Sequence, residues 1–425
     1  MTFMKSVLRL GFTIVGLTLS NFTAVKTLAA DFTFTKIADT TDGFTSFFTA
    51  PALNNSGTVA FSATLGDGST GIFTGSGGAI TPLAVSSGTN PSFLSVLTNP
   101  ALNNAGTVVF GATTGSPKNV GIFTSLGKGL TTIATLNTTA LSDSSHASVT
   151  PAINDVGTVA FGAYTVTTVP NPNPPPYGSV APSVFISNKK NLSTIELKSN
   201  VSGAVPTAPN SVAINNANTV VFSSGYGGSS GYGGLFAKAG DTALLTLQRG
   251  GADPVSLNNQ GTYATGVAGA GESTAIIIGD SSKGIIGSSE DSSKRYIFGQ
   301  SGYDGSVPRR VSNPSINDQD QVAFQATTSA GYTYPGSQSL FFNDFTDANK
   351  IITTGDSLFG STVTSIGEFS TRGLNNSNQV VFYARLADGR AGIVRAEPVP
   401  EPSTLMASVL FLLGFGARTM VKHRL

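Results

Sequence analysis

Short apolar stretches alternate with polar turns along most of this chain, and one arrangement of the two recurs seven times. Each copy has a few apolar or small residues, an Asn, two further residues, then Gly, Asn or Asp, and an apolar strand that usually ends at Phe. The first copy reads Pro51-Ala-Leu-Asn54-Asn-Ser-Gly57-Thr-Val-Ala-Phe61. The Asn that opens the turn of each copy is Asn54, Asn103, Asn154, Asn215, Asn258, Asn317 or Asn375. Repeats of this kind are typical of propellers and solenoids.

The turn inside each copy has a simple chemistry. The first Asn side chain can accept a hydrogen bond from the backbone two residues on, and the fourth position requires a positive φ, which Gly, Asn and Asp tolerate best. That position holds Gly57, Gly106, Gly157, Asn218, Gly261, Asp320 and Asn378. The pattern predicts a hairpin turn, so we interpret the repeated Asn residues as structural.

Successive copies lie 49, 51, 61, 43, 59 and 58 residues apart, which is long enough for four short strands each. After the turn strand comes a short apolar strand such as Gly71-Ile-Phe73, and in six copies a fourth strand follows, for example 80–85 or 295–298. The seventh copy ends near Ala396 without a fourth strand, while an isolated strand of the same type occupies 32–38. An all-β, seven-bladed β-propeller closed by the N-terminal strand satisfies this pattern, because closure leaves no unpaired sheet edge. An open β-array or two β domains are the alternatives.

The two ends of the chain differ from the repeats. Residues 1–30 combine Lys5 and Arg9 with an apolar stretch and small residues before Asp31, which indicates a secretory signal peptide. Residues 31–396 form the predicted propeller. Residues 397–425 contain Pro400-Glu-Pro402, an apolar run over 405–417 that predicts a short helix, and a basic cluster at the end.

This three-part tail resembles the PEP-CTERM sorting signal of exported bacterial proteins. The resemblance implies recognition by an exosortase-type enzyme, cleavage near Pro400, Glu401 and Pro402, and delivery to the cell surface or an extracellular matrix. Membrane contact would then be transient and limited to this segment. The repeats in turn resemble the tandem Asn-x-x-Gly-x-x-Ala-Phe repeats of exported bacterial proteins, which implies no particular activity; the fifth copy departs from them with Tyr263-Ala-Thr265.

Composition narrows the possible functions. The chain has no Cys, which excludes disulfides, thiolate metal sites and a Cys nucleophile. Residues 31–402 carry 18 basic and 23 acidic side chains, so the body is mildly acidic and a nucleic-acid partner is not expected. The two His residues, His146 and His423, cannot form a His-based triad or multi-His metal site within the repeats.

We therefore expect no catalytic residues, no metal and no cofactor. A carboxylate pair such as Asp253 with Glu272 or Asp304 leaves open the alternative of a propeller enzyme that acts on extracellular polysaccharide. The oxygen-rich segment Asn317-Asp-Gln-Asp320 could attract Ca²⁺, but it coincides with the repeat turn and lacks an EF-hand loop.

The connections between the second and third strands vary most and are rich in Tyr. In a propeller these connections lie on the face opposite the Asn turns. Exposed Tyr rings can stack on sugars or anchor a protein partner. The sequence therefore predicts contact with extracellular polysaccharide or a matrix protein, although flexible low-complexity insertions would look the same. The candidate contact residues are Tyr177, Tyr226, Tyr232, Tyr332 and Tyr334.

Overall fold

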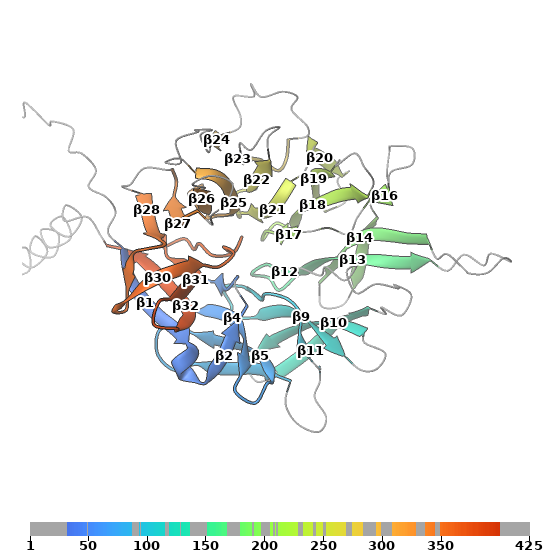
Figure 1. Ribbon diagram of the computed structural model, residues 1–425. Helices are drawn as coiled ribbons and strands as arrows, with labels where there is room; N and C mark the ends of the chain where they lie inside the picture. Colours follow the sequence, from blue (N-terminus) through green and yellow to red (C-terminus); the bar gives the residue numbers. More distant parts are fainter. Residues whose placement is uncertain are drawn as a thin grey trace, which may run out of the picture.

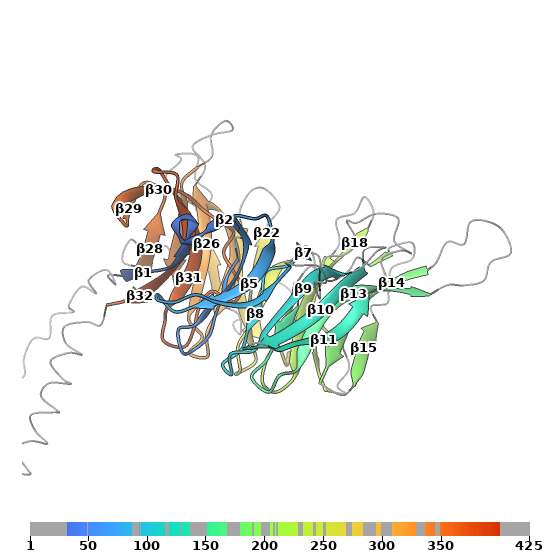
Figure 2. The ribbon, with the colours of Figure 1, turned by 90° about the horizontal axis from the view of Figure 1, so that it is seen from below.

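In the computed structural model, seven antiparallel sheets surround a central axis (Figure 1). The structure describes residues 32–48, 50–86, 93, 95–114, 119–127, 129–136, 151–167, 179–188, 191–196, 205–206, 209, 211–227, 233–240, 244–249, 252–268, 274–283, 295–298, 308–328, 336–344 and 349–399. The predicted signal peptide, 1–30, lies outside these residues, as do residues 400–425 of the predicted sorting tail with their predicted helix. The tail was predicted to begin at residue 397, but the last strand of the propeller continues to Pro398. In Figure 2 the blades are seen from the side.

The first three blades follow one another along the chain. Blade 1 contains β2 (Phe44–Phe47), β3 (Ala52–Leu53), β4 (Val59–Leu65), β5 (Thr70–Gly75) and β6 (Thr81–Val85). Blade 2 contains β7 (Ser95–Val96), β8 (Ala101–Leu102), β9 (Val108–Thr114), β10 (Asn119–Leu126) and β11 (Gly129–Leu136). Blade 3 contains β12 (Ala152–Ile153), β13 (Val159–Thr167), β14 (Ser179–Ser187) and β15 (Leu192–Glu196).

The next three blades repeat the same order. Blade 4 contains β16 (Val205–Pro206), β17 (Ser211–Ile214), β18 (Thr219–Gly227), β19 (Gly233–Ala239) and β20 (Leu245–Arg249). Blade 5 contains β21 (Ala252–Leu257), β22 (Thr262–Ala268), β23 (Thr274–Asp280) and β24 (Arg295–Phe298). Blade 6 contains β25 (Pro308–Ile316), β26 (Val322–Thr328), β27 (Gln338–Phe342) and β28 (Lys350–Thr353). The fourth strand of the fourth copy, which the sequence predicts over 243–247, begins two residues later, as β20.

Both ends of the described chain build blade 7. The C-terminal part of the chain contributes β29 (Ser357–Leu358), β30 (Ser361–Ile366), β31 (Val380–Leu386) and β32 (Ala391–Pro398). The N-terminal part contributes β1 (Phe32–Asp39), which is the outermost strand. β1 pairs antiparallel with β32 from Phe32↔Pro398 to Asp39↔Gly392. In Figures 1 and 2, β1 (blue) and β32 (orange-red) lie side by side. The predicted closure by the N-terminal strand is confirmed.

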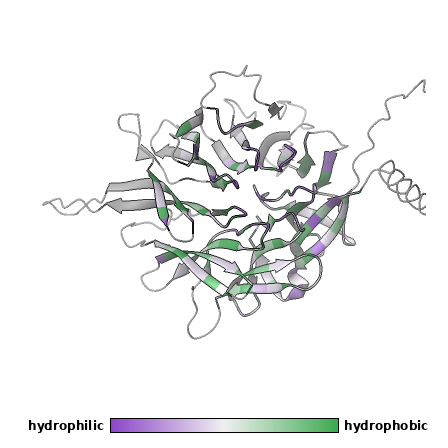
Figure 3. Cartoon of the chain, turned by 180° about the vertical axis from the view of Figure 1, so that it is seen from behind, coloured by the Kyte–Doolittle hydropathy of each residue, from purple (hydrophilic) through white to green (hydrophobic). Residues whose placement is uncertain are grey.

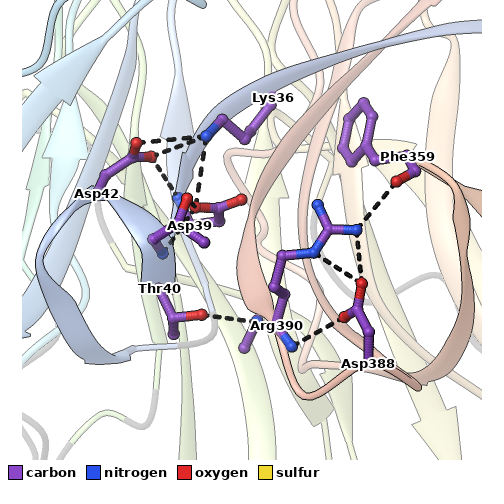
Figure 4. A network of polar contacts seen from close by, with 9 residues as sticks. Lys36, Asp39, Thr40, Asp42, Phe359, Asp388 and Arg390 are labelled. Carbon is purple, nitrogen blue, oxygen red and sulfur yellow. Dashed lines mark hydrogen bonds and ion pairs between the residues drawn. The ribbon is translucent and has the colours of Figure 1, made fainter.

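Polar contacts hold this closing strand in place (Figure 4). A short 3-10 helix, η1 (Thr40–Asp42), follows β1 and has Asp39 as its N-cap. The Lys36 ammonium lies 3.4 Å from Asp39 and 3.2 Å from Asp42, and the Ala391 amide donates to the Thr40 hydroxyl at 3.4 Å. On the adjacent hairpin Arg390 pairs with Asp388 at 2.7 Å. The Ala391–Thr40 bond joins the residue after β1 to β32, and the ion pairs stabilise the two segments that meet there.

The innermost strand is interrupted in blades 1, 2 and 4, which the repeat pattern did not predict. Two separate short strands pair with β4, β9 and β18, respectively. Each break contains a proline: Pro51, Pro100 or Pro209. Because proline has no backbone N–H to donate, it interrupts the ladder at these points.

The hydrophobic core lies between the blades. One buried cluster joins Ala60 and Ile72 of blade 1 to Val108 and Phe110 of blade 2, and similar clusters join the other neighbours. Figure 3 shows hydrophobic segments along the strands of successive blades. The Phe that ends the repeat motif faces an aromatic partner on the third strand in five blades. The pairs are Phe61–Phe73, Phe110–Phe123, Phe161–Phe185, Phe222–Phe236 and Phe324–Phe341.

Blade 5 shows how the departure in the fifth copy is accommodated. Thr265 takes the usual Phe position, and the ring of Tyr263, two residues earlier on the same face, is buried instead. Tyr263 pairs with Gly279, where an added Cβ would lie 2.6 Å from the Tyr263 hydroxyl. The glycine therefore makes room for the displaced aromatic ring.

Candidate functional site: the central channel

The Asn turns form one mouth of the channel. Each repeat Asn accepts, through Oδ1, the backbone N–H four residues on, at 2.8–3.0 Å in all seven copies. In five copies the same oxygen also accepts the N–H two residues on, as predicted. The fourth turn position has positive φ throughout, from 58° at Asp320 to 88° at Gly261. The predicted turn is confirmed.

The same Asn side chains join the blades into a closed inner ring. The Nδ2 group of each one donates to the backbone carbonyl of the repeat Asn in the next blade, at 2.9–3.3 Å. The last bond runs from Asn375 to Asn54 and closes the circle at 3.0 Å. These side chains are all buried. Each repeat Asn therefore stabilises its own turn and the interface to the next blade.

A second, outer ring lies one residue further along each turn. Its members are Asn55, Asn104, Asp155, Asn216, Asn259, Asp318 and Asn376. The backbone N–H of each member donates to Oδ1 of the next member, at 2.8–3.0 Å, and the bond from Asn376 to Asn55 completes the circle. The two rings together cross every blade interface at this mouth.

The two carboxylates have a defined place in the outer ring. Asp155 accepts the side-chain amides of Asn104 and Asn216 at 2.9 and 2.8 Å, and Asp318 accepts those of Asn259 and Asn376 at 3.1 and 2.8 Å. Because an Asn Oδ1 in the ring is already used by a backbone N–H, its NH₂ group needs an acceptor beside it. The Asp residues supply that acceptor.

The surroundings of Asp155 favour its charged form. Burial acts to raise the pKa of Asp155, but hydrogen bonds from the Asn216 side chain and from the backbone and side chain of Asn104 outweigh it. The pKa of this carboxyl group is therefore lowered. At neutral pH the outer ring contains a carboxylate whose lone pairs are engaged by amide donors.

Behind the rings the channel encloses about 150 Å³, which is room for several water molecules or a small solute. Directly inside the Asn rings, the residue before each repeat Asn contributes to an apolar collar. The collar consists of Leu53, Leu102, Ile153, Ile214, Leu257, Ile316 and Leu374. Polar turns at the mouth and an apolar wall behind them define the cavity.

One cationic side chain, Arg372, lies in this cavity. Its Nη2 donates to the Val212 carbonyl at 3.2 Å. Val212 belongs to blade 4, three blades from blade 7 around a ring of seven, so the side chain reaches across the channel. Arg372 is half-buried and lines the cavity. Burial lowers the pKa of Arg372 to about 10, which leaves it protonated at neutral pH.

Of the predicted contact residues, the structure describes only the backbone of Tyr226. Tyr226 is in β18, where its backbone pairs with Pro206, but its side chain lies outside the description, as do Tyr177, Tyr232, Tyr332 and Tyr334. Pro400, Glu401 and Pro402 also fall outside the described residues. Of the carboxylates considered for catalysis, Asp253 is in β21 with no side chain described, and Glu272 and Asp304 lie outside the description.

Within the described residues no group of three or more His, Asp or Glu side chains could hold a metal ion. The segment Asn317–Asp320 is used by the turn and the rings: Asn317 belongs to the inner ring, Asp318 belongs to the outer ring, and Asp320 takes the positive-φ position. Among the described residues, no helix has the length and apolar character needed to cross a membrane.

Two features of the channel were not predicted from the sequence. Every copy has Asn or Asp directly after the repeat Asn, which is the signal for the outer ring. Six copies have Pro or Val three residues before that Asn, whereas the seventh has Arg372. Both signals are visible in an alignment of the copies, but their meaning depends on the ring geometry.

Seven blades of four or five strands, closed by strands from both ends of the chain, define this protein as a seven-bladed β-propeller. The chain belongs to a family of unknown function, DUF7453, whose model matches residues 83–292 and 211–406. None of the curated proteins matches the sequence.

Several solved structures resemble the chain in overall shape. The Dos1 propeller is 10% identical, with a TM-score of 0.47 over 85% of this chain and 94% of that one. The β-propeller domain of the Trilobed protease from Pyrococcus furiosus is 10% identical, with a TM-score of 0.48 over 84% and 98%. The Hadza microbial sialidase Hz136 is 10% identical, with a TM-score of 0.40 over 80% and 73%. We therefore assign the fold from the strand pairing of the chain itself, and not from these identities and TM-scores.

Proposed function

We propose that this propeller is an exported structural or binding protein of the cell surface or extracellular matrix. The main support for this proposal is a difference between the two faces of the propeller. On one face every turn is tied to the next by the Asn rings, whereas the connections between second and third strands, on the other face, vary from 66–69 in blade 1 to 168–178 in blade 3. A rigid scaffold that carries variable loops is a common arrangement for binding.

The variable connections supply the candidate contacts. Tyr177, Tyr232, Tyr332 and Tyr334 fall between second and third strands in the chain, and Tyr226 is near the end of β18. Aromatic rings bind sugars and protein surfaces by stacking. We propose extracellular polysaccharide or a matrix protein as the partner of this face.

Retention on immobilised matrix polysaccharide tests the binding proposal. A variant with all five of these Tyr residues changed to Ser should be retained less than the wild-type protein. A matched control changes Gln260 and Gln319, which are exposed on the Asn-turn face, to Ala and should be retained normally. Unchanged retention of the Tyr variant would contradict the proposal, and sugar products released from the matrix would favour an enzyme.

The tail provides the second part of the proposal. Pro400-Glu-Pro402, the apolar run and the basic end support recognition by an exosortase-type enzyme. A fluorescent tag inserted before Val399 should reach the cell exterior on a chain shortened near this motif. Changing Pro400, Glu401 and Pro402 to Ala should leave the uncut chain in the inner membrane. Wild-type protein that stays there at full length would argue against sorting by this route.

A further inference from the structure

Arg372 is the exception in an otherwise apolar position of the repeat. The residue three before each repeat Asn is Pro51, Pro100, Pro151, Val212, Val255 or Pro314 in the first six copies. Arg372 occupies the same position in the seventh copy, and its side chain lines the channel. The structure of the repeat does not require a cation here, because six blades are built without one.

The charge of Arg372 has no counter-ion in the part of the chain that the structure describes. The one hydrogen-bond partner of its side chain there is the neutral Val212 carbonyl, at 3.2 Å. A guanidinium has five N–H donors in a fixed plane, so most of its donors are left for the cavity. Burial is also the cause of its lowered pKa, with no carboxylate acting against it.

A cation that lines a protein cavity without a counter-ion is unfavourable, and an anion beside it would offset the cost. The carboxylates of the outer ring do not serve this purpose. Asp155 and Asp318 line the same cavity, but each accepts two Asn side-chain amides, and among the described residues neither forms an ion pair with Arg372. The cavity of about 150 Å³ has room for a small solute next to the guanidinium.

We propose that the central channel is a binding site for a small oxyanion, with Arg372 as its principal ligand. The planar fork of a guanidinium matches the two oxygens of a carboxylate, phosphate or sulfate group. The Val212 carbonyl orients the fork by holding one Nη group. The site is separate from the variable loops and does not depend on where the protein is delivered.

Thermal unfolding of the purified full-length chain tests this site. Titration with sodium phosphate, sulfate or acetate, against sodium chloride at equal ionic strength, should raise the Tm of the wild-type protein by about 2 °C or more at saturation, since a ligand of the folded state stabilises it. The three anions distinguish a phosphate-like from a carboxylate ligand. Arg372→Gln and Arg372→Met should lose this response.

A matched control is Arg385→Gln, because Arg385 is exposed on β31 and outside the channel. It should respond to the oxyanion like the wild type. Arg372→Lys keeps a charge without the fork and should bind about tenfold more weakly in calorimetric titration. A wild-type protein whose Tm and binding heats respond no more to oxyanions than to chloride would overturn the proposal. The same holds for an Arg372→Met protein that still binds.

Discussion

Asn154 shows what a single side chain of the repeat contributes. Its Oδ1 accepts the Thr158 N–H at 2.8 Å within its own turn, and its Nδ2 donates to the Asn215 carbonyl and to Asn218 Oδ1, both at 2.9 Å, in the next blade. Asn154→Ala would leave these buried groups without partners. We expect the free energy of unfolding to fall by about 2–4 kcal/mol, measured by urea denaturation.

A suitable control is Asn191→Ala, in the exposed turn before β15. Surface substitutions of this kind change stability by about 0.5 kcal/mol or less. Equal effects of the two substitutions would show that the inner ring contributes nothing beyond a surface turn.

The outer ring makes stability depend on pH in acid. The pKa of Asp155 is lowered in the folded protein, so its contribution is present above the unfolded pKa of about 3.9 and is lost as the pH falls through the folded value. Asp155→Asn should lower stability at neutral pH, since Asn104 and Asn216 lose their acceptor.

The same substitution should reduce the further loss of stability as the pH falls below about 5. Urea titrations at several pH values measure both effects. An acid-dependent loss as large in Asp155→Asn as in the wild type would contradict this assignment.

The sequence predicts the residue-scale turn but not the cross-blade bonds. Turn chemistry depends on four neighbouring residues, so Asn54 and Gly57 are sufficient to predict it. The bond from Asn375 to Asn54 joins residues 321 apart. Such a contact follows only from the arrangement of the whole ring.

At the scale of the element, the fourth turn position can be tested in blade 2. Gly106 has φ 84°, and a Cβ added there would have its nearest neighbour, Leu126, at 3.8 Å. Backbone strain rather than space therefore limits this position. Gly106→Asn should stay within about 1 kcal/mol of the wild type, as Asn218 and Asn378 occupy the same conformation.

Gly106→Val should lower the free energy of unfolding by about 2 kcal/mol, because a β-branched residue disfavours positive φ. Comparison of the two variants by urea denaturation separates conformation from side-chain bulk. Similar stabilities of Gly106→Val and Gly106→Asn would contradict the predicted role of the turn.

Strands were predictable wherever the apolar pattern was strong. The third strands and the fourth strand β24 (Arg295–Phe298) occur where the pattern indicated them. The interruption of the innermost strand near Pro51, Pro100 and Pro209 was not predicted. The repeat pattern predicts the turn, whereas the interruption depends on the N–H groups that these prolines lack.

At the scale of the whole molecule, the number of strands in each copy was enough to predict that the ring of blades closes. A seventh copy without a fourth strand and an isolated N-terminal strand together complete one blade, and β1 pairs with β32 as expected. The role of Arg372 could not be predicted in this way. Its partner Val212 is 160 residues away and becomes a neighbour only across the closed channel.

A single engineered disulfide can show whether β1 closes the ring against β32. The chain has no Cys, so Thr33→Cys with Glu397→Cys introduces one possible pair at opposed positions of the two strands. A control pairs Thr33→Cys with Arg395→Cys, two residues out of register, where the Cβ separation of about 7 Å exceeds what a disulfide spans.

Mild oxidation of the folded protein, followed by electrophoresis with and without reductant, measures the cross-link. We expect an intramolecular disulfide in most of the protein that carries Thr33→Cys and Glu397→Cys, and little in the control. No cross-link in the first variant, or equal cross-linking in both, would contradict closure of the propeller by its N-terminal strand.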